Sequence, residues 1–192
     1  MPGSHLGSMD LLTAALTAIG LAACAGLRAF LPIFGIGVAA RLLHWQLQPP
    51  LDVLASDTGL VIFGLAAVLE VAADKIPVVD NALDAIHTIL GPLVGVLAAY
   101  IPFSTLPPAY ALALAIMTGV TVAGGVHALA ATTRIQSSLL TMGVANPVLS
   151  LLEDAFVLAT LAVTILAPLV LLFLVGGAII WIRRRSRIRL AG

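Results

Sequence analysis

Long stretches without charged side chains dominate the sequence and limit the folds open to it. Residues 155–182 contain no charged side chain, and further apolar stretches lie at residues 10–44, 59–74 and 110–131. A helix needs roughly 20 apolar residues to cross a bilayer, so the chain has room for about five or six hydrophobic elements. The continuous Ala- and Leu-rich runs lack the alternation of a membrane β-barrel. We predict an all-α, polytopic transmembrane helical bundle in a single domain over residues 9–182.

Proline and glycine predict that some of these elements are broken or re-entrant. Pro32 predicts a kink or break within residues 10–44, and Pro77 predicts the end of the helix that begins near Gly59. Asp80 then fits the N-cap of a short helix that ends near Leu90. We expect Gly91-Pro92 to start the next element.

The second half of the chain shows similar interruptions. Asn146-Pro147 predicts a broken or re-entrant element, and the cleanest spanning helix is expected at residues 155–182. The segments AGLRAF (25–30) and GGVHAL (124–129) resemble each other. This similarity favours an internal repeat of the kind found in transporters. Chance similarity between short, simple segments remains the alternative.

The two ends of the chain differ from its body. Residues 1–8, MPGSHLGS, resemble the remnant of an expression tag, so we leave them out of the functional interpretation. Residues 183–192 form a basic tail in which Arg183 to Arg189 carry five of the nine Lys and Arg residues. The positive-inside rule predicts a cytoplasmic C-terminus, and the tail fits contact with anionic lipid headgroups. Nucleic-acid binding is not expected from so short a segment beside a membrane helix.

Residues 70–87 concentrate charge between two apolar segments. Glu70 and Asp74 are four residues apart, which places both carboxylates on one face of a helix. Such a pair disfavours joint ionisation, so it suits proton coupling, or it binds a shared cation. The alternative is an ordinary helix end at the headgroups, with Asp74 and Lys75 in water.

Three further residues of this segment form a candidate metal site. Asp80, Asp84 and His87 follow a spacing that places them on one helix stripe. Carboxylate oxygens and an imidazole suit a divalent cation. An amphipathic interfacial helix would show the same stripe. Cys24 is the single cysteine, so a cluster of thiolate ligands is excluded.

The remaining polar candidates lie far apart in the sequence. Asn146 and Glu153 share a stripe with Ser150, and Asp154 lies beside it. His127 and Arg134 are seven residues apart on one face. Arg28 lies between apolar runs, where an unpaired guanidinium is costly, so we expect a carboxylate or a ligand phosphate beside it. Arg28 and Arg134 would hold an anionic headgroup or substrate, or, with Lys75, would only neutralise the carboxylates.

Several blocks together resemble the DUF4126 family, a bacterial domain of unknown function, over about residues 10–175. They are GLRAFLPIFGIGVAAR, EVAADKIPVVDNALDAIHTILGPLVG, AGGVHALAATTR and ANPVLSLLEDAF. The resemblance implies a small multi-pass protein of the bacterial inner membrane whose activity is not established. The family's motif residues match at Arg28, Pro32, Glu70, Asp74, Lys75, Pro77, Asp80, Asp84, His87, His127, Arg134, Asn146, Pro147, Glu153 and Asp154. Ala131 departs from the family, which often carries lysine there, and this weakens an anion-binding role for that face.

We expect transport of a small ion or solute, or translocation of a lipid-linked phosphate, through a carboxylate-rich internal site, with proton or cation coupling as an option. The expected site residues are Glu70, Asp74, Asp80, Asp84, Glu153, Asp154, Arg28, His127, Arg134 and Asn146. A membrane-embedded enzyme that uses a divalent cation on a lipid phosphate is one alternative. A structural or assembly protein whose charges only join helices is another. Association into a homo-oligomer stays open.

Overall fold

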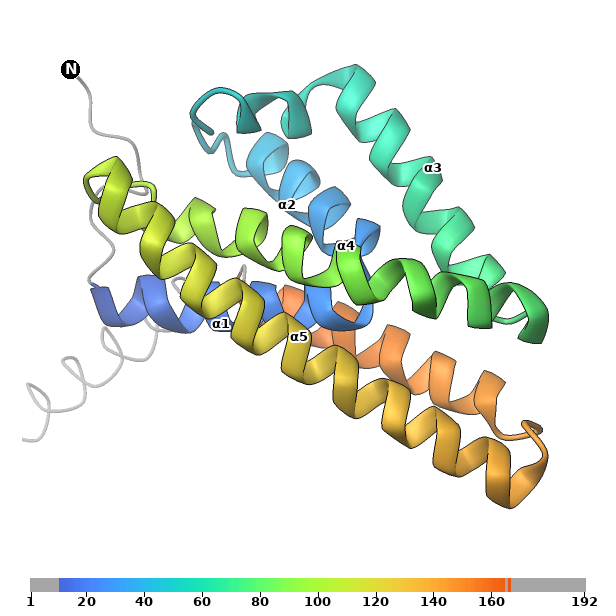
Figure 1. Ribbon diagram of the computed structural model, residues 1–192. Coiled ribbons are helices and arrows are strands. Elements are labelled where there is room, and N and C mark those ends of the chain that lie inside the picture. Colours follow the sequence, from blue (N-terminus) through green and yellow to red (C-terminus); the bar gives the residue numbers. More distant parts are fainter. Residues whose placement is uncertain (1–10, 165, 167–192) are drawn as a thin grey trace, which may run out of the picture.

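The computed structural model describes residues 11–164 and 166, and for residues 77, 78 and 80–84 it describes the backbone without the side chains. Within this part of the chain the structure is all helical and contains no strand, as predicted. The elements in chain order are α1 (Leu11–Leu27), α2 (Phe30–Leu42), the short 3-10 helix η1 (Leu51–Ala55), α3 (Asp57–Ala73), α4 (Pro77–Phe103) and α5 (Pro108–Thr141). A further helix, Asn146–Thr164, follows α5 (Figure 1).

Three described helices are long and apolar enough to cross a membrane. They are Ala85–Phe103 within α4, Pro108–Thr141 and Asn146–Thr164. Helices α1 and α2 are apolar but shorter. Leucine, isoleucine and valine side chains remain exposed along these helices, which suits contact with lipid. The structure therefore agrees with a transmembrane helical bundle.

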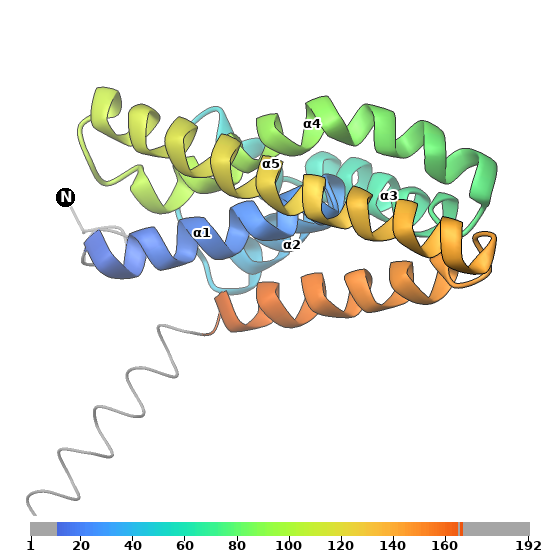
Figure 2. The same cartoon turned by 60° about the horizontal axis from the view of Figure 1, so that its bottom comes forward.

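Helices α1 and α2 form a hairpin whose tip is Arg28 and Ala29. The contacts that fix their directions all involve the helix Asn146–Thr164; they join Gly20 to Thr164, Cys24 to Val157, Arg28 to Asp154 and Gly35 to Leu161. As α1 approaches the tip, the residues that it contacts in the last helix come earlier in the sequence, from Thr164 to Asp154. Along α2 the contacted residue comes later again, at Leu161. Helix α2 therefore runs back from the tip, and Figure 1 shows that it does so at an angle to α1, toward η1 and α3. Figure 2 shows the same elements from another side.

The break in this first segment lies before the proline that was expected to cause it. Helix α1 ends at Leu27 and α2 begins at Phe30, so Pro32 lies in the first turn of α2. A first-turn amide has no acceptor within its own helix, and a proline there is tolerated. The expected break exists, but Pro32 is not its location.

Two expectations for the next segment are wrong. Helix α4 continues without interruption through Gly91 and Pro92, and its N-cap is Ile76 and not Asp80. Pro77 occupies the first turn, where it favours helix initiation. Gly91 faces α1, where a Cβ atom would make an ordinary contact, 3.4 Å from the Ala25 carbonyl oxygen.

The last helix begins earlier than expected. After α5, residues 142–145 form a turn in which Met142 and Gly143 have positive φ. The helix then starts at Asn146, so Glu153 and Asp154 lie inside it and do not precede it. The expected spanning helix at 155–182 includes residues 165 and 167–182, which lie outside the described residues, as does the basic tail.

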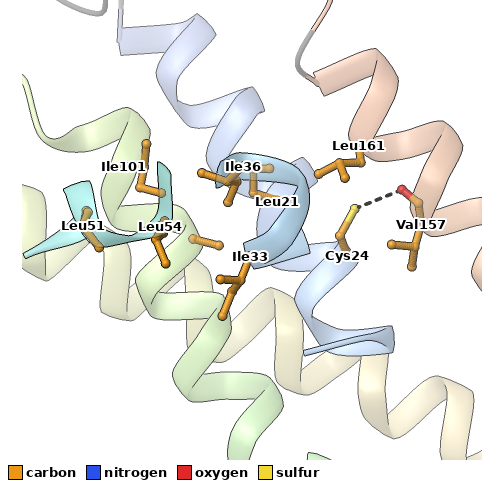
Figure 3. Close-up of a cluster of buried hydrophobic side chains, with 10 residues drawn as sticks. Leu21, Cys24, Ile33, Ile36, Leu51, Leu54, Ile101, Val157 and Leu161 are labelled. Atoms are coloured by element: carbon orange, nitrogen blue, oxygen red, sulfur yellow. Dashed lines mark hydrogen bonds between the residues drawn. The ribbon is translucent and has the colours of Figure 1, made fainter. Parts of the chain in front are cut away.

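The main apolar core joins the hairpin to its neighbours. It contains Leu21 and Cys24 of α1, Ile33 and Ile36 of α2, Leu51 and Leu54 of η1, Ala98 and Ile101 of α4, and Val157 and Leu161 of the last helix (Figure 3). The Cys24 thiol lies 3.7 Å from the Val157 carbonyl oxygen. This core fixes the hairpin between α4 and the helix Asn146–Thr164, and it thereby fixes the position of Arg28.

Candidate functional site

Arg28 lies at the hairpin tip and is 1% exposed. Its Nε atom donates to Asp154 Oδ1 at 2.7 Å, and its Nη2 atom donates to Asp74. Nη2 also lies 3.2 Å from the Ser150 hydroxyl oxygen. The backbone N–H of Arg28 still bonds to the Cys24 carbonyl, at 2.9 Å, so α1 delivers the side chain directly. The expected carboxylate partner of Arg28 is confirmed: Asp74 and Asp154 accept its hydrogen bonds, and Glu153 Oε2 lies 3.8 Å from Nη2.

Asp74 binds a second guanidinium. Arg134 of α5 donates from Nη1 to Asp74 Oδ1 at 3.0 Å. Its Nη2 atom also forms an ion pair with Glu153. The Ser150 hydroxyl donates to Asp74 as well. Asp74 therefore connects the end of α3 to the hairpin tip, to α5 and to the last helix.

Lys75 completes this group from its outer side. Its Nζ atom lies 2.8 Å from Asp154 Oδ2 and also donates to the Val71 carbonyl at 3.0 Å. The side chain is 32% exposed, whereas that of Arg28 is fully buried. We call the whole group the ion network; its members are Arg28, Asp74, Lys75, Arg134, Ser150, Glu153 and Asp154. Three cations face three carboxylates, so the network is neutral when all are charged.

Glu70 does not join the ion network, although it lies one turn before Asp74. Its carboxylate accepts hydrogen bonds from the backbone N–H groups of Ala29 at 2.6 Å, Phe30 at 3.0 Å and Leu31 at 3.3 Å. These are the first amides of α2, which have no acceptor within their own helix. A negative charge at a helix N-terminus is also stabilised by the helix dipole. Glu70 therefore caps α2 from a neighbouring helix.

His87 of α4 provides another contact to Glu70. Its Nε2 atom lies 2.8 Å from Glu70 Oε1, and both residues are buried. The Glu70–His87 pair thus links α3 and α4 to the N-terminus of α2. Glu70 and Asp74 consequently have separate partners: one holds the backbone of the hairpin tip, and the other holds the Arg28 side chain.

Other expected site residues lie apart from the ion network. His127 Nε2 of α5 is 3.2 Å from the Thr88 hydroxyl of α4. Asn146 donates from Nδ2 to the Ser138 hydroxyl at 2.9 Å, beside the turn after α5. These two residues therefore connect neighbouring helices at other places in the bundle.

The metal-site prediction is only partly covered by the structure. The side chains of Asp80 and Asp84 lie outside the described residues. Among the side chains that are described, no group of three or more His, Cys, Asp or Glu residues is placed to hold a metal ion. His87, the third candidate ligand, lies against Glu70.

The two similar segments differ in local structure. AGLRAF (25–30) contains the break between α1 and α2, whereas GGVHAL (124–129) lies inside the continuous helix α5. The basic residue of the first segment joins the ion network, and the histidine of the second lies near Thr88.

The sequence did not predict two features of this region, namely the capping of α2 by Glu70 and the place of Ser150 in the ion network. The capping of α2 by Glu70 leaves no local signal, because the residues lie about forty positions apart. Ser150 was recognised only as part of a stripe with Asn146 and Glu153. Its i, i+4 spacing to Asp154 is the signal that associates it with the carboxylates.

The model of one protein family matches most of the chain. It is described as a domain of unknown function, DUF4126, and it matches residues 15–187. No curated protein and no solved structure matches the chain.

Proposed function

We propose a transport function for this chain, which belongs to the DUF4126 family, a family described only as a domain of unknown function. The cargo is a small ion or solute, or a lipid-linked phosphate, and its passage is coupled to a proton or cation. One observation carries the proposal. The ion network gathers six charged side chains at the tip of a hairpin that turns back inside a membrane-type bundle. Ionisable residues inside membrane proteins characteristically form substrate and ion pathways.

The chemistry of the network suits exchange of partners. Each arginine is held by carboxylates, so an anionic group can take its place beside Arg28 or Arg134 only if a carboxylate withdraws or takes a proton. Glu153 is the carboxylate best placed to do so. Its side chain is 14% exposed, while that of Asp74 is 2% exposed. Asp154 is 12% exposed, but it binds both Arg28 and Lys75 at short distance. Protonation of Glu153 would remove one of the two counter-charges of Arg134 and leave the other, Asp74, so that one side of the guanidinium becomes available to a ligand.

Glu70 gives the hairpin a second point of control. A proton on this carboxylate would remove the negative charge that faces the N-terminus of α2 and would weaken the three backbone hydrogen bonds. His87 lies within hydrogen-bond reach as the proton partner. We propose that this pair couples proton movement to the position of the hairpin tip.

A purely structural role is the second candidate. Its support is that every cation of the ion network already has a carboxylate partner. In this view the charges join four segments of the bundle and bind nothing else. The metal-dependent enzyme remains a prediction, since the side chains of Asp80 and Asp84 lie outside the described residues.

Flux measurements in proteoliposomes test the transport proposal. A panel of inorganic ions and phosphate-bearing lipids is tried with the unaltered chain, with Glu70→Gln and with Glu153→Gln. We expect both substitutions to bring the flux toward that of protein-free vesicles. Asp57→Asn is the matched control, because Asp57 forms its ion pair with Arg41 at the surface, with its side chain 85% exposed. Unchanged flux of every tested ion and lipid in both variants would overturn the transport proposal.

A further inference from the structure

A groove on the side of the bundle reaches one member of the ion network. It lies between α1, α5 and the helix Asn146–Thr164 and has a volume of about 420 Å³. Its walls include Leu27 of α1, Ala130 of α5 and Phe156 of the last helix, and Glu153 is the charged residue in its lining. Volumes of this size are typical of sites for small ligands.

The groove faces the surroundings of the bundle and not its centre. Leu129, Leu152 and Phe156 line it and are 69%, 62% and 54% exposed. In a membrane-spanning bundle such side chains lie against acyl chains. An occupant that enters from the bilayer would therefore place an apolar tail along these residues and a polar head at Glu153.

The charge of Glu153 determines which lipid headgroup the groove favours. Both contacts of Glu153 to the arginines use Oε2, which forms an ion pair with Arg134 and lies 3.8 Å from Arg28 Nη2. Neither arginine contributes to the groove lining, and the Arg28 side chain is fully buried. A head that enters the groove meets a carboxylate first. An ionised carboxylate accepts hydrogen bonds and donates none, so a donor with positive charge is favoured there over a group that can only accept.

We propose that this groove binds a bilayer lipid whose head carries a primary ammonium group, and that Glu153 receives that ammonium. The inference rests on the proposed function in one respect, namely that it names the class of cargo for the same site. A zwitterionic lipid with a phosphate beside its ammonium belongs to this class and agrees with a lipid-linked phosphate as cargo. The binding itself does not depend on transport.

A second groove in the same chain provides a matched comparison. It lies between α2 and the helix Asn146–Thr164 and also has a volume of about 420 Å³. Its lining is apolar, with Val38, Leu158 and Ala162 among the residues, and it contains no charged side chain. This groove can accept acyl chains, but it has no group that distinguishes one head from another.

Native mass spectrometry of the detergent-purified full chain tests the inference. The protein is titrated with phosphatidylethanolamine and with phosphatidylcholine of identical acyl chains, which differ in whether the head nitrogen can donate a hydrogen bond. We expect phosphatidylethanolamine to bind about tenfold more tightly, as one charge-assisted hydrogen bond implies. Phosphatidylglycerol, whose phosphate has no ammonium beside it, is expected to bind no better than phosphatidylcholine.

Three variants locate the preference. Glu153→Gln should reduce the preference for phosphatidylethanolamine to near unity, and Ala130→Phe should weaken its binding by filling the groove while leaving every ion pair intact. Ala162→Phe fills the second groove and should leave the preference unchanged. Melting temperatures of the variants identify any that fail to fold, and Ala130→Phe keeps the test decisive if Glu153→Gln is among them.

The outcomes separate this inference from the proposed function. Equal binding of the two lipids by the unaltered chain, or unchanged binding of phosphatidylethanolamine by Ala130→Phe, would overturn the ammonium site whatever the flux measurements give. A preference that depends on Glu153 and Ala130, combined with unaltered flux in both Glu70→Gln and Glu153→Gln, would instead leave the lipid site standing and overturn the transport proposal.

Discussion

At Arg28 a single guanidinium joins α3 to the helix Asn146–Thr164, because Asp74 and Asp154 bind different nitrogen atoms of it. Arg28→Ala leaves two carboxylates of the interior without this cation, and we expect a loss of about 3–5 kcal/mol in the free energy of unfolding. Arg28→Lys should recover only part of this loss, since an ammonium group cannot present two donors in the fixed geometry of a guanidinium. Unfolding in detergent measures both variants.

The Arg41–Asp57 pair is the control for this prediction. It joins α2 to α3 at the surface, with the Arg41 side chain 50% exposed. Exposed ion pairs contribute about 0–1 kcal/mol, so Arg41→Ala should change the stability little. Equal losses for Arg28→Ala and Arg41→Ala would show that the burial of Arg28 has no energetic consequence.

Glu70 acts on the backbone of the hairpin tip, and its effect can be observed at single amides. Glu70→Gln keeps the size of the side chain but removes the charge that faces the first amides of α2 and the ion pair with His87. We expect faster hydrogen exchange at residues 29–31 while the amides in the middle of α5 keep their protection. Unchanged exchange at the tip would contradict the capping role.

At the residue scale, the sequence predicted what each charge requires but not where the requirement is met. The need of Arg28 for an anionic partner follows from its apolar surroundings. The identity of that partner does not, because Asp74 and Asp154 lie 46 and 126 residues away. The same limit applies to Glu70, whose hydrogen-bond donors are backbone groups of a distant segment.

Among the elements, α4 and α5 approach each other through glycine. A Cβ atom at Gly119 of α5 would collide with the backbone nitrogen of Val96 in α4, whereas one at Gly125 would meet nothing within 4 Å. Gly119→Ala should therefore destabilise the bundle by about 1–3 kcal/mol, the usual cost of overpacking. Gly125→Ala should be neutral, or should stabilise by about 0.5–1 kcal/mol because alanine is the better helix former.

Unfolding of the two variants side by side measures this difference in stability. Gly125→Ala is the matched control, because both variants replace a glycine of α5 by alanine. If both variants behave alike, the close contact between α4 and α5 is not a feature of the folded protein.

Proline and glycine in the sequence predict only some of the helix boundaries. Pro77 separates α3 from α4 as predicted, because the residue before a proline avoids the helical conformation. Pro92 was expected to interrupt a helix and does not: α4 continues through it from Pro77 to Phe103. The break between α1 and α2 occurs at Arg28 and Ala29, neither of which is proline or glycine. Its orphaned backbone groups are satisfied from outside the hairpin, by Glu70 at the start of α2.

For the whole molecule, composition predicted the all-α membrane architecture because apolar runs of this length have few other stable forms. The ion network was foreseen only as a set of residues. Arg28, Asp74 and Lys75 come from the first half of the chain, and the other members come from the second. Their convergence depends on the packing of the hairpin between α4 and the last helix, and no local pattern encodes that arrangement.

The central claim is that the ion network is a transport site and does more than connect helices. Arg134→Gln combined with Glu153→Gln tests it. Replacement of both members of a buried pair by residues of similar volume is often nearly neutral, whereas loss of one member is not. Asp74 loses its contact with Arg134 in this variant but keeps Arg28. The double variant keeps the net charge and leaves Arg28, Lys75 and Asp154 in place.

Flux through proteoliposomes that contain this double variant is the most direct measurement. It is made on protein whose melting temperature equals that of the unaltered chain, for a cargo that the unaltered chain transports. We predict that the folded double variant has lost the flux. Flux at the level of the unaltered chain would contradict the account and would leave the charges with a structural role alone.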